Sequence, residues 1–347
     1  MSNKFSRTIT DWYRKFGREL PWRDTNDPYL IWISEIILQQ TRVAQGYSYF
    51  QRFISRFPDV ATLADAQEEE VMKYWEGLGY YSRARNLHAA ARSMNGVFPT
   101  TYEGVRALKG VGDYTAAAIC SFAYRMPYAV VDGNVYRVLS RYFGIDIPID
   151  STQGRKLFHE LAMEVMDARR PDVYNQAIMD FGALQCTPVS PKCLFCPLSG
   201  SCKALAQGKV ASLPVKQHKT RTVDRYFNYL YVDAGAYTFL RQRTGNDIWK
   251  NLFEFPLIET ATPVEQAELL QLPGFTSLIR PGEKPAVGLI CRDIKHVLSH
   301  RIIYASFYKI ELPEQTLSFE AYRKVRKEEI GTYALSRLIL KFMDKHL

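Results

Sequence analysis

Two kinds of hydrophobic pattern divide the chain. Up to about Cys202, apolar residues recur at intervals of three and four, which is typical of amphipathic helices. After residue 222, apolar and polar residues alternate in segments rich in β-branched and aromatic side chains, which is typical of strands. The segment between them is polar, basic and interrupted by proline, as a linker is. The pattern therefore predicts an all-α domain (1–206), a basic linker (207–222) and an α+β domain (223–347).

The same pattern predicts individual elements. Asp27-Pro28 is an N-cap followed by a first-turn proline, and it should open a helix over 29–41. Further helices are expected over 68–76, 83–94, 114–124, 135–142 and 154–168. In the second domain we expect strands within 226–243 on either side of a turn at Ala234-Gly235, another strand over 302–312, and an amphipathic helix over 334–346.

Composition and charge narrow the class of protein. The chain has 347 residues, 47% of them hydrophobic, which is enough for about two domains with cores. Its formal net charge of +9 permits nucleic-acid binding without proving it. The N-terminus lacks the continuous apolar core of a signal peptide, and the apolar run Leu30–Leu38 is too short to span a bilayer. We therefore expect a soluble, cytoplasmic protein in a reducing compartment, with no membrane partner.

Four cysteines lie within seventeen residues, in the spacing C-x6-C-x2-C-x5-C: Cys186, Cys193, Cys196 and Cys202. No histidine lies among them, so the site is all-sulfur, which suits Zn²⁺ or a [4Fe–4S] cluster. Two local disulfides would need an oxidising compartment. A structural zinc site usually presents two C-x2-4-C pairs, so the spacing favours iron–sulfur and leaves zinc as the alternative.

A glycine-rich turn and two carboxylates are the other chemical candidates. Gly110 and Gly112 form a tight turn before a helix whose N-terminal N–H groups suit a DNA phosphate; the alternative is an ordinary helix corner. Glu35 has apolar neighbours on its helix, so burial should raise its pKa and make it a general acid; the alternative is a solvent-facing glutamate. Asp132 stands before a new helix, where a simple N-cap is the favoured interpretation and a cation-stabilising carboxylate the alternative.

Together these motifs resemble a known family. LKGVGDYTAAA, VDGNVYRV and the cysteine pattern occur in the order and spacing of the endonuclease III superfamily of DNA glycosylases. Within it the chain is similar to the MutY family of adenine DNA glycosylases through LPWR (20–23), WISEIILQQT (32–41), GLGYYSRARNL (77–87) and NQAIMDFGALQC (175–186). The resemblance covers the first domain and extends more weakly into the second. It implies a [4Fe–4S] cluster on the four cysteines and a monomer acting on double-stranded DNA with adenine opposite 8-oxoguanine or guanine.

The resemblance also implies residue roles. Glu35 would protonate adenine at N7, and an ionised Asp132, held by Asn134 and Tyr114, would stabilise the oxocarbenium-like sugar. Bifunctional members have a lysine where this chain has Tyr114, so a monofunctional glycosylase is implied. The adenine pocket would comprise Trp22, Arg23, Leu38 and Gln176; the space beside 8-oxoguanine would be filled by Gln40, Thr41 and Tyr80; and Gly110, Gly112 and Lys192 would meet the DNA backbone.

The second domain resembles the Nudix-like domain that reads 8-oxoguanine in this family. The R-E-x2-E-E helix of true Nudix hydrolases is absent, so pyrophosphate hydrolysis is not expected. The family's Phe-Ser-His loop corresponds to Leu298-Ser299-His300, in which Ser299 would bond the damaged base and His300 lie beside it. Leu298 departs from the pattern, because leucine can wedge but cannot stack as a ring does. A pyrimidine-specific endonuclease III-like enzyme and a non-catalytic DNA-binding protein are the rival functions; Tyr114 argues against the first, and the pair Glu35 and Asp132 against the second.

Overall fold

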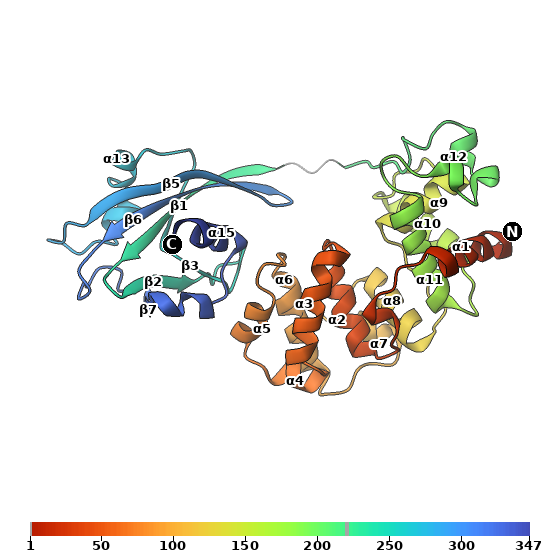
Figure 1. Ribbon diagram of the computed structural model, residues 1–347, viewed down its shortest axis with the longest axis horizontal. Coiled ribbons are helices and arrows are strands. Elements are labelled where there is room, and N and C mark those ends of the chain that lie inside the picture. The colour runs from red at the N-terminus through yellow and green to blue at the C-terminus, as the bar shows by residue number, and fades with distance from the viewer. Residues whose placement is uncertain (1, 219–221) are drawn as a thin grey trace. The chain divides into compact units, whose positions relative to one another are not determined.

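The computed structural model describes residues 2–218 and 222–347, and the chain divides into two compact units (Figure 1). The first unit comprises Met1–Asp65 and Asn86–Lys219, and the second Ala66–Arg85 and Thr220–Leu347. The segment Ala66–Arg85 thus groups with the C-terminal unit, although in sequence it lies inside the helical region. The predicted linker 207–222 includes residues 219–221, which lie outside the described residues.

The first unit is built from helices. They are α1 (Ser2–Phe16), α2 (Pro28–Leu38), α3 (Val43–Arg56), α4 (Val60–Asp65), most of α6 (Ser82–Ser93), α7 (Tyr102–Arg106), α8 (Asp113–Tyr124), α9 (Gly133–Phe143), α10 (Thr152–Val165), α11 (Pro171–Asp180) and α12 (Lys203–Ala206), with 3-10 turns at Pro21–Arg23, Cys193–Phe195 and Ser199–Ser201 and a π-helical turn at Phe181–Gln185. No helix in 2–218 or 222–347 combines the length and apolar character needed to cross a membrane.

All six helices predicted for the N-terminal region are present, and two of them end three residues earlier than predicted. Asp27 caps α2 as predicted, accepting a hydrogen bond from Tyr29 N at 2.8 Å ahead of Pro28. However, α2 ends at Leu38 instead of Thr41, because Gln40 adopts a left-handed backbone with φ of 56° that cannot continue a helix. The helix predicted over 154–168 ends at Val165, where the next residue is extended. Six helices in the described part of this unit were not predicted: α1, α3, α4, α7, α11 and α12.

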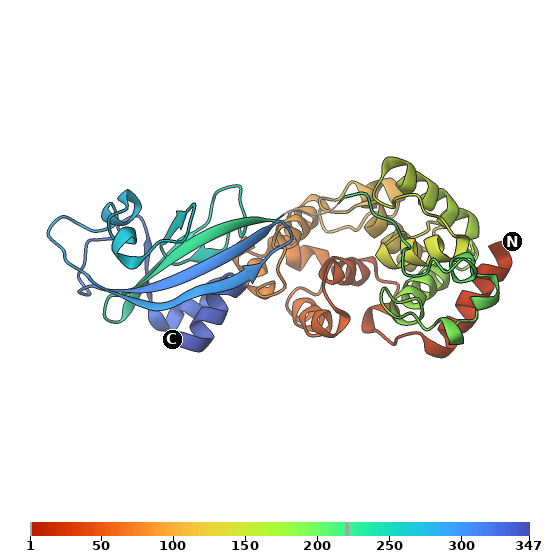
Figure 2. The ribbon, with the colours of Figure 1, turned by 90° about the horizontal axis from the view of Figure 1, so that it is seen from above.

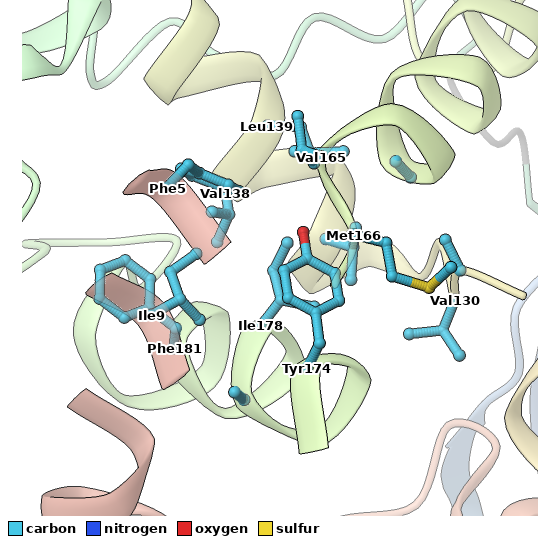
Figure 3. Close-up of a cluster of buried hydrophobic side chains, with 14 of the residues drawn as sticks. Phe5, Ile9, Val130, Val138, Leu139, Val165, Met166, Tyr174, Ile178 and Phe181 are labelled. Carbon is cyan, nitrogen blue, oxygen red and sulfur yellow. The ribbon is translucent and has the colours of Figure 1, made fainter. Parts of the chain in front are cut away.

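A buried hydrophobic cluster holds α1, α9, α10 and α11 together (Figure 3). Ile9 of α1, Leu139 of α9 and Ile178 of α11 are at most 1% exposed in it. Burying each such side chain contributes about 1.5–3 kcal/mol. Since Asp132 caps α9 and Gln176 lies on α11, this cluster fixes two walls of the site described below.

The second unit contains two sheets, with strand orders β4-β1-β6-β5 and β3-β2-β7. Its elements are α5 (Glu68–Tyr74), β1 (Val223–Asp233), β2 (Tyr237–Gln242), β3 (Phe253–Glu254), β4 (Leu257–Thr260), α13 (Gln266–Leu269), α14 (Pro273–Thr276), β5 (Ala286–Val297), β6 (Arg301–Glu311), β7 (Arg323–Arg326), a 3-10 turn at Lys327–Thr332 and α15 (Arg337–His346). β1 runs parallel to β6, which pairs antiparallel with the long β5, and Figure 2 shows the three side by side.

The strand and helix predictions for this unit are confirmed. β1 and β2 flank the predicted turn, where Gly235 has φ of 63°, and β6 covers the predicted third strand. The tail helix is α15, which packs on β6 through the stacked rings of Phe342 and Phe307, with centroids 3.8 Å apart. A mixed α+β unit therefore follows the helical one.

Candidate active site

A cavity of about 200 Å³ in the first unit brings together most of the predicted catalytic and base-binding residues. It lies where α2, the start of α8, the start of α9 and α11 meet. Its lining includes Trp22, Arg23, Glu35, Leu38, Thr41, Tyr114, Asp132, Asn134 and Gln176. Residues up to about 150 positions apart in sequence thus converge on one small space.

Glu35 is buried at the cavity wall, with 7% of its surface exposed. Burial raises its pKa to about 7, against the opposing effects of a hydrogen bond from Tyr114 and the charge of Arg23. The predicted direction of this shift is confirmed, and the solvent-facing alternative is wrong. A carboxyl with this pKa holds its proton in a large share of molecules at neutral pH, as a general acid requires.

Tyr114 lies beside Glu35, at the start of α8. Its hydroxyl donates to Glu35 Oε2 at 2.9 Å. Burial first, and then the charge of Glu35, raises the pKa of the phenol well above its ordinary value, so Tyr114 is neutral and acts as a donor. The phenol of Tyr114 is thus directed at Glu35, and the expectation that Tyr114 would hold Asp132 stays a prediction.

Asp132 both caps a helix and lies in the cavity, so the sequence-based alternatives of an N-cap and a carboxylate at a cleft are compatible. It is the N-cap of α9, accepting 2.8 Å hydrogen bonds from Asn134 N and Val135 N, and it also lines the cavity. Its second oxygen accepts from the Asn134 side chain at 2.8 Å, as expected for Asn134. Burial raises the pKa of Asp132, and these three hydrogen bonds oppose the rise.

Arg137 positions the Asn134 side chain by a hydrogen bond. Its Oδ1 accepts from Arg137 Nη2 at 2.8 Å, which directs the amide nitrogen towards Asp132. Arg137 also donates to the backbone oxygen of Cys186 at 2.7 Å. The start of α9 is thereby tied to the first residue of the cysteine segment.

A hydrogen-bond network around Asp180, which the sequence pattern did not predict, positions Arg23 at the cavity wall. Asp180, the last residue of α11, is fully buried and accepts two 2.8 Å hydrogen bonds from Arg23. Arg18 donates to the same carboxylate through its backbone N and Nε, at 2.8 and 2.9 Å. The available signal was an aspartate one helical turn after Gln176, on the same face of the helix.

The residues predicted to lie beside 8-oxoguanine fall into both units. Thr41 lines the cavity of the first unit, and Gln40 follows the end of α2. Tyr80 lies in the second unit with φ of 47°, and its hydroxyl is 2.6 Å from Ser299 Oγ. Tyr80, Leu298, Ser299 and His300 together line a cavity of about 330 Å³.

All four cysteines of the predicted cluster line one pocket, together with Lys192. No cysteine in the described part of the chain forms a disulfide. Burial raises the pKa of Cys186, and that of Cys196 to about 11, while Arg141 Nη1 donates to Cys186 Sγ at 3.5 Å. Within 2–218 and 222–347, no three His, Cys, Asp or Glu side chains are placed to hold a single metal ion. Four thiols around one pocket nevertheless supply the donor set of an iron–sulfur cluster or of zinc.

The predicted glycine-rich turn lies immediately before α8. Gly110 has φ of 83°, and a Cβ there would lie 2.8 Å from Asn86 Cβ, so the turn requires glycine. Gly112 caps α8, and a Cβ there would meet nothing within 4 Å, which leaves its backbone open to a ligand. The first N–H groups of α8 lack helical partners and can receive an anion.

Family models match both units. Residues 33–163 match the HhH-GPD superfamily of base excision DNA repair proteins, and residues 228–345 match the NUDIX domain.

Relatives with similar sequences are named adenine DNA glycosylases. The one from Buchnera aphidicola subsp. Baizongia pistaciae is 36% identical over 307 residues, which are 86% of this chain and 84% of the relative. The one from Homo sapiens is 40% identical over 232 residues, covering 60% of this chain and 42% of the relative.

Solved structures share the fold of the helical unit. A thermostable thymine-DNA glycosylase has a TM-score of 0.55 at 30% identity, over 59% of this chain and 97% of that chain. Endonuclease III, trapped covalently on DNA, has a TM-score of 0.52 at 20% identity, over 60% and 98%. The second of these likenesses concerns the fold alone.

Proposed function

The chain belongs to the adenine DNA glycosylases, enzymes of base excision repair, and on that premise we propose that it removes adenine paired with 8-oxoguanine or guanine by hydrolysing the N-glycosidic bond. The observation that carries this proposal is the meeting, in one cavity, of a buried Glu35 with a pKa of about 7 and a hydrogen-bonded Asp132. Two carboxyls in different environments are the division of labour that glycosidic hydrolysis uses. Adenine reaches the cavity by extrusion from the duplex.

Glu35 acts as the general acid. Tyr114 bonds Oε2, so the proton is presented to the base from Oε1. Protonation of adenine at N7 makes it a better leaving group, which is the step that an acid near pH 7 catalyses. Trp22, Arg23, Leu38 and Gln176 surround the base in the same cavity.

Asp132 acts as the ionised partner. Three hydrogen bonds and its place at the N-terminus of α9 favour the carboxylate. The positive charge that develops on the sugar compensates for the burial of this anion. Tyr114 offers no amine for a Schiff base with the sugar, so the enzyme is monofunctional.

Cys186, Cys193, Cys196 and Cys202 would hold a [4Fe–4S] cluster, which the endonuclease III-like family generally carries; zinc is the alternative for the same donors. Since the hydrolysis transfers no electrons, such a cluster would supply a structural centre for the cysteine segment. Lys192 of that segment meets a DNA phosphate. Gly110 and Gly112 bind the backbone of the same duplex, and the enzyme acts as a monomer.

Recognition of 8-oxoguanine belongs to Tyr80, Ser299 and His300, with Gln40 and Thr41 beside the orphaned base. The 2.6 Å contact between Tyr80 and Ser299 supports this assignment, since it brings two segments 219 residues apart to one cavity. Leu298 offers no ring for stacking, so the preference for 8-oxoguanine over guanine is narrower than a phenylalanine would give.

Single-turnover base release tests the function. The substrates are duplexes with adenine opposite 8-oxoguanine, guanine or thymine, and with thymine glycol opposite adenine. We expect fast adenine release from the first, slower release from the second and none from the others. Equal rates on the first two would retain adenine excision and refute lesion recognition. Release of thymine glycol with strand cleavage would refute the assignment of Glu35 and Tyr114. Asp132→Asn should still bind the mispaired duplex but release no base, which excludes a purely DNA-binding role.

A further inference from the structure

A chain of hydrogen bonds behind the cavity ends on the amide of Gln176. Tyr13 of α1 donates its hydroxyl to Gln176 Oε1 at 2.8 Å, and Arg23 Nη1 approaches the Tyr13 oxygen at 3.4 Å. The described lining of the cavity includes Gln176 and Arg23 but not Tyr13. Tyr13 therefore acts on the cavity only through its neighbours.

Arg23 is fixed independently of Tyr13. Both of its terminal nitrogens bond the buried Asp180, and Nη1 also donates to the backbone oxygen of Arg18 at 2.9 Å. Burial raises the pKa of Asp180, but hydrogen bonds from Arg23 and Arg18 outweigh it and hold that pKa below its usual range. Asp180 is thus an ionised anchor for Arg23.

The direction of the Tyr13 proton follows from the chemistry of these groups. An arginine can only donate, so the Tyr13 oxygen accepts from Arg23 and its single proton is left for Gln176. Gln176 then turns its oxygen to Tyr13 and its amide nitrogen to the cavity. The Tyr13 ring packs directly against the backbone of Gly17, because a Cβ there would lie 2.5 Å from Tyr13 Cδ2 and Cε2.

We propose that Tyr13 is a positioning residue for base recognition, which fixes the amide of Gln176 as a hydrogen-bond donor to a ring nitrogen of the excised purine. The inference rests on the proposed adenine excision and specifies which end of the amide meets the base. With N7 taken by Glu35, the acceptor is N1 or N3 of adenine. Without the Tyr13 hydroxyl, the amide can rotate and present its oxygen, which no ring nitrogen can bond.

A double-mutant cycle of Tyr13→Phe and Gln176→Ala tests this, with single-turnover adenine release from the 8-oxoguanine duplex as the readout. Tyr13→Phe should slow release about tenfold in the wild-type background. In the Gln176→Ala background it should change the rate less than about twofold, because the group through which Tyr13 acts is gone. Equal losses in both backgrounds would overturn the inference.

Base analogues distinguish a change in the orientation of the Gln176 amide from a general loss of activity in the Tyr13→Phe variant. In the wild type, replacing adenine by the deaza analogue that lacks the bonded nitrogen (1-deazaadenine or 3-deazaadenine) should slow base release. This loss of rate should be smaller in Tyr13→Phe, and as small as in Gln176→Ala, because neither variant makes the hydrogen bond to that nitrogen. Identical penalties in wild type and Tyr13→Phe would overturn the proposal even if the variant were unstable. Tyr124→Phe is the matched control, because it removes a hydroxyl that donates to Pro99 O at 2.9 Å outside the cavity lining, and it should keep the wild-type rate. If wild type released no adenine, the proposed function would fail together with this inference, whereas additive losses in an active enzyme refute the inference alone.

Discussion

At Glu35, burial of the carboxyl in the cavity wall raises its pKa to about 7. Tyr114 donates a hydrogen bond to one carboxyl oxygen, and this bond and the charge of Arg23 oppose the rise without cancelling it, so more of Glu35 is protonated than an exposed glutamate would be. Asp132 is buried as well but accepts three hydrogen bonds, two of them from the N-terminus of α9. The two carboxyls thus differ in the number of hydrogen bonds that they accept, which supports the different roles proposed for them.

The rate of base release should depend on pH in both directions. Above about pH 7, Glu35 loses its proton, and the single-turnover rate should fall towards tenfold per pH unit. On the acid side the rate should fall as Asp132, whose pKa burial raises, takes up a proton. Single-turnover rates on the 8-oxoguanine duplex between pH 5 and 9 measure this profile. A rate that stays level up to pH 9 would exclude Glu35 as the acid.

The stability of the fold should also depend on the charge of Glu35. Its pKa rises from 4.5 to about 7 on folding, so between these values the folded state holds a proton that the unfolded state lacks. The stability that the raised pKa of Glu35 gives the fold relative to high pH is fully present below pH 4.5 and is lost as the pH rises through 7. The free energy of unfolding of Glu35→Gln should therefore rise by about 3 kcal/mol relative to that of the wild type between pH 4 and pH 8. Urea unfolding of both proteins across this range measures the gain; a constant difference would contradict it.

At the level of elements, two helix starts supply part of the site. Tyr114 lies in the first turn of α8 and Asp132 caps α9, whereas Glu35 lies in the last turn of α2. A helix start combines a fixed backbone direction with unpaired N–H groups, which suits both a carboxylate and a DNA phosphate. The π-helical turn after α11 then brings Gly182 against the first turn of α9.

Gly182→Ala should damage the site through this contact. The added Cβ would lie 2.6 Å from Asn134 Cβ and 3.0 Å from its backbone oxygen, so Asn134 and Asp132 must move. We expect about 1–3 kcal/mol of destabilisation and a rate about 10- to 100-fold lower. Thermal unfolding and single-turnover release measure the two effects. Gly245→Ala, whose Cβ would meet nothing within 4 Å, is the control and should change neither.

At the level of the whole molecule, the net charge bears on DNA binding, and the division into two units bears on where the proposed functions lie. A net charge of +9 attracts the DNA backbone without reading sequence. The residues proposed for the glycosidic chemistry line a cavity of the first unit, while Tyr80 belongs with Leu298, Ser299 and His300 to the second. The proposed base excision is thus confined to the first unit, whereas the residues proposed for lesion recognition come from both units.

DNA affinity should fall steeply with salt, and Lys192 should account for part of the dependence. Lys192→Ala should weaken binding about equally for mispaired and matched duplexes and reduce the slope of log affinity against log salt by about one. Fluorescence anisotropy between 50 and 200 mM salt measures the slope. An unchanged slope, or a loss confined to the mispair, would show that Lys192 meets no phosphate.

The sequence by itself determined what depends on neighbouring residues. Periodicity located ten elements: α2, α5, α6, α8, α9, α10, α15, β1, β2 and β6. Asp27 and Asp132 could be identified as candidate caps because a cap bonds N–H groups two or three residues away, and the four cysteines stand out because they lie within one short segment. Only the tertiary structure decided which distant groups meet. Tyr114 faces Glu35 across 79 residues, Tyr13 reaches Gln176 across 163, and Ala66–Arg85 groups with the second unit. Such pairings depend on how several packed elements orient a side chain, and no local pattern records that orientation.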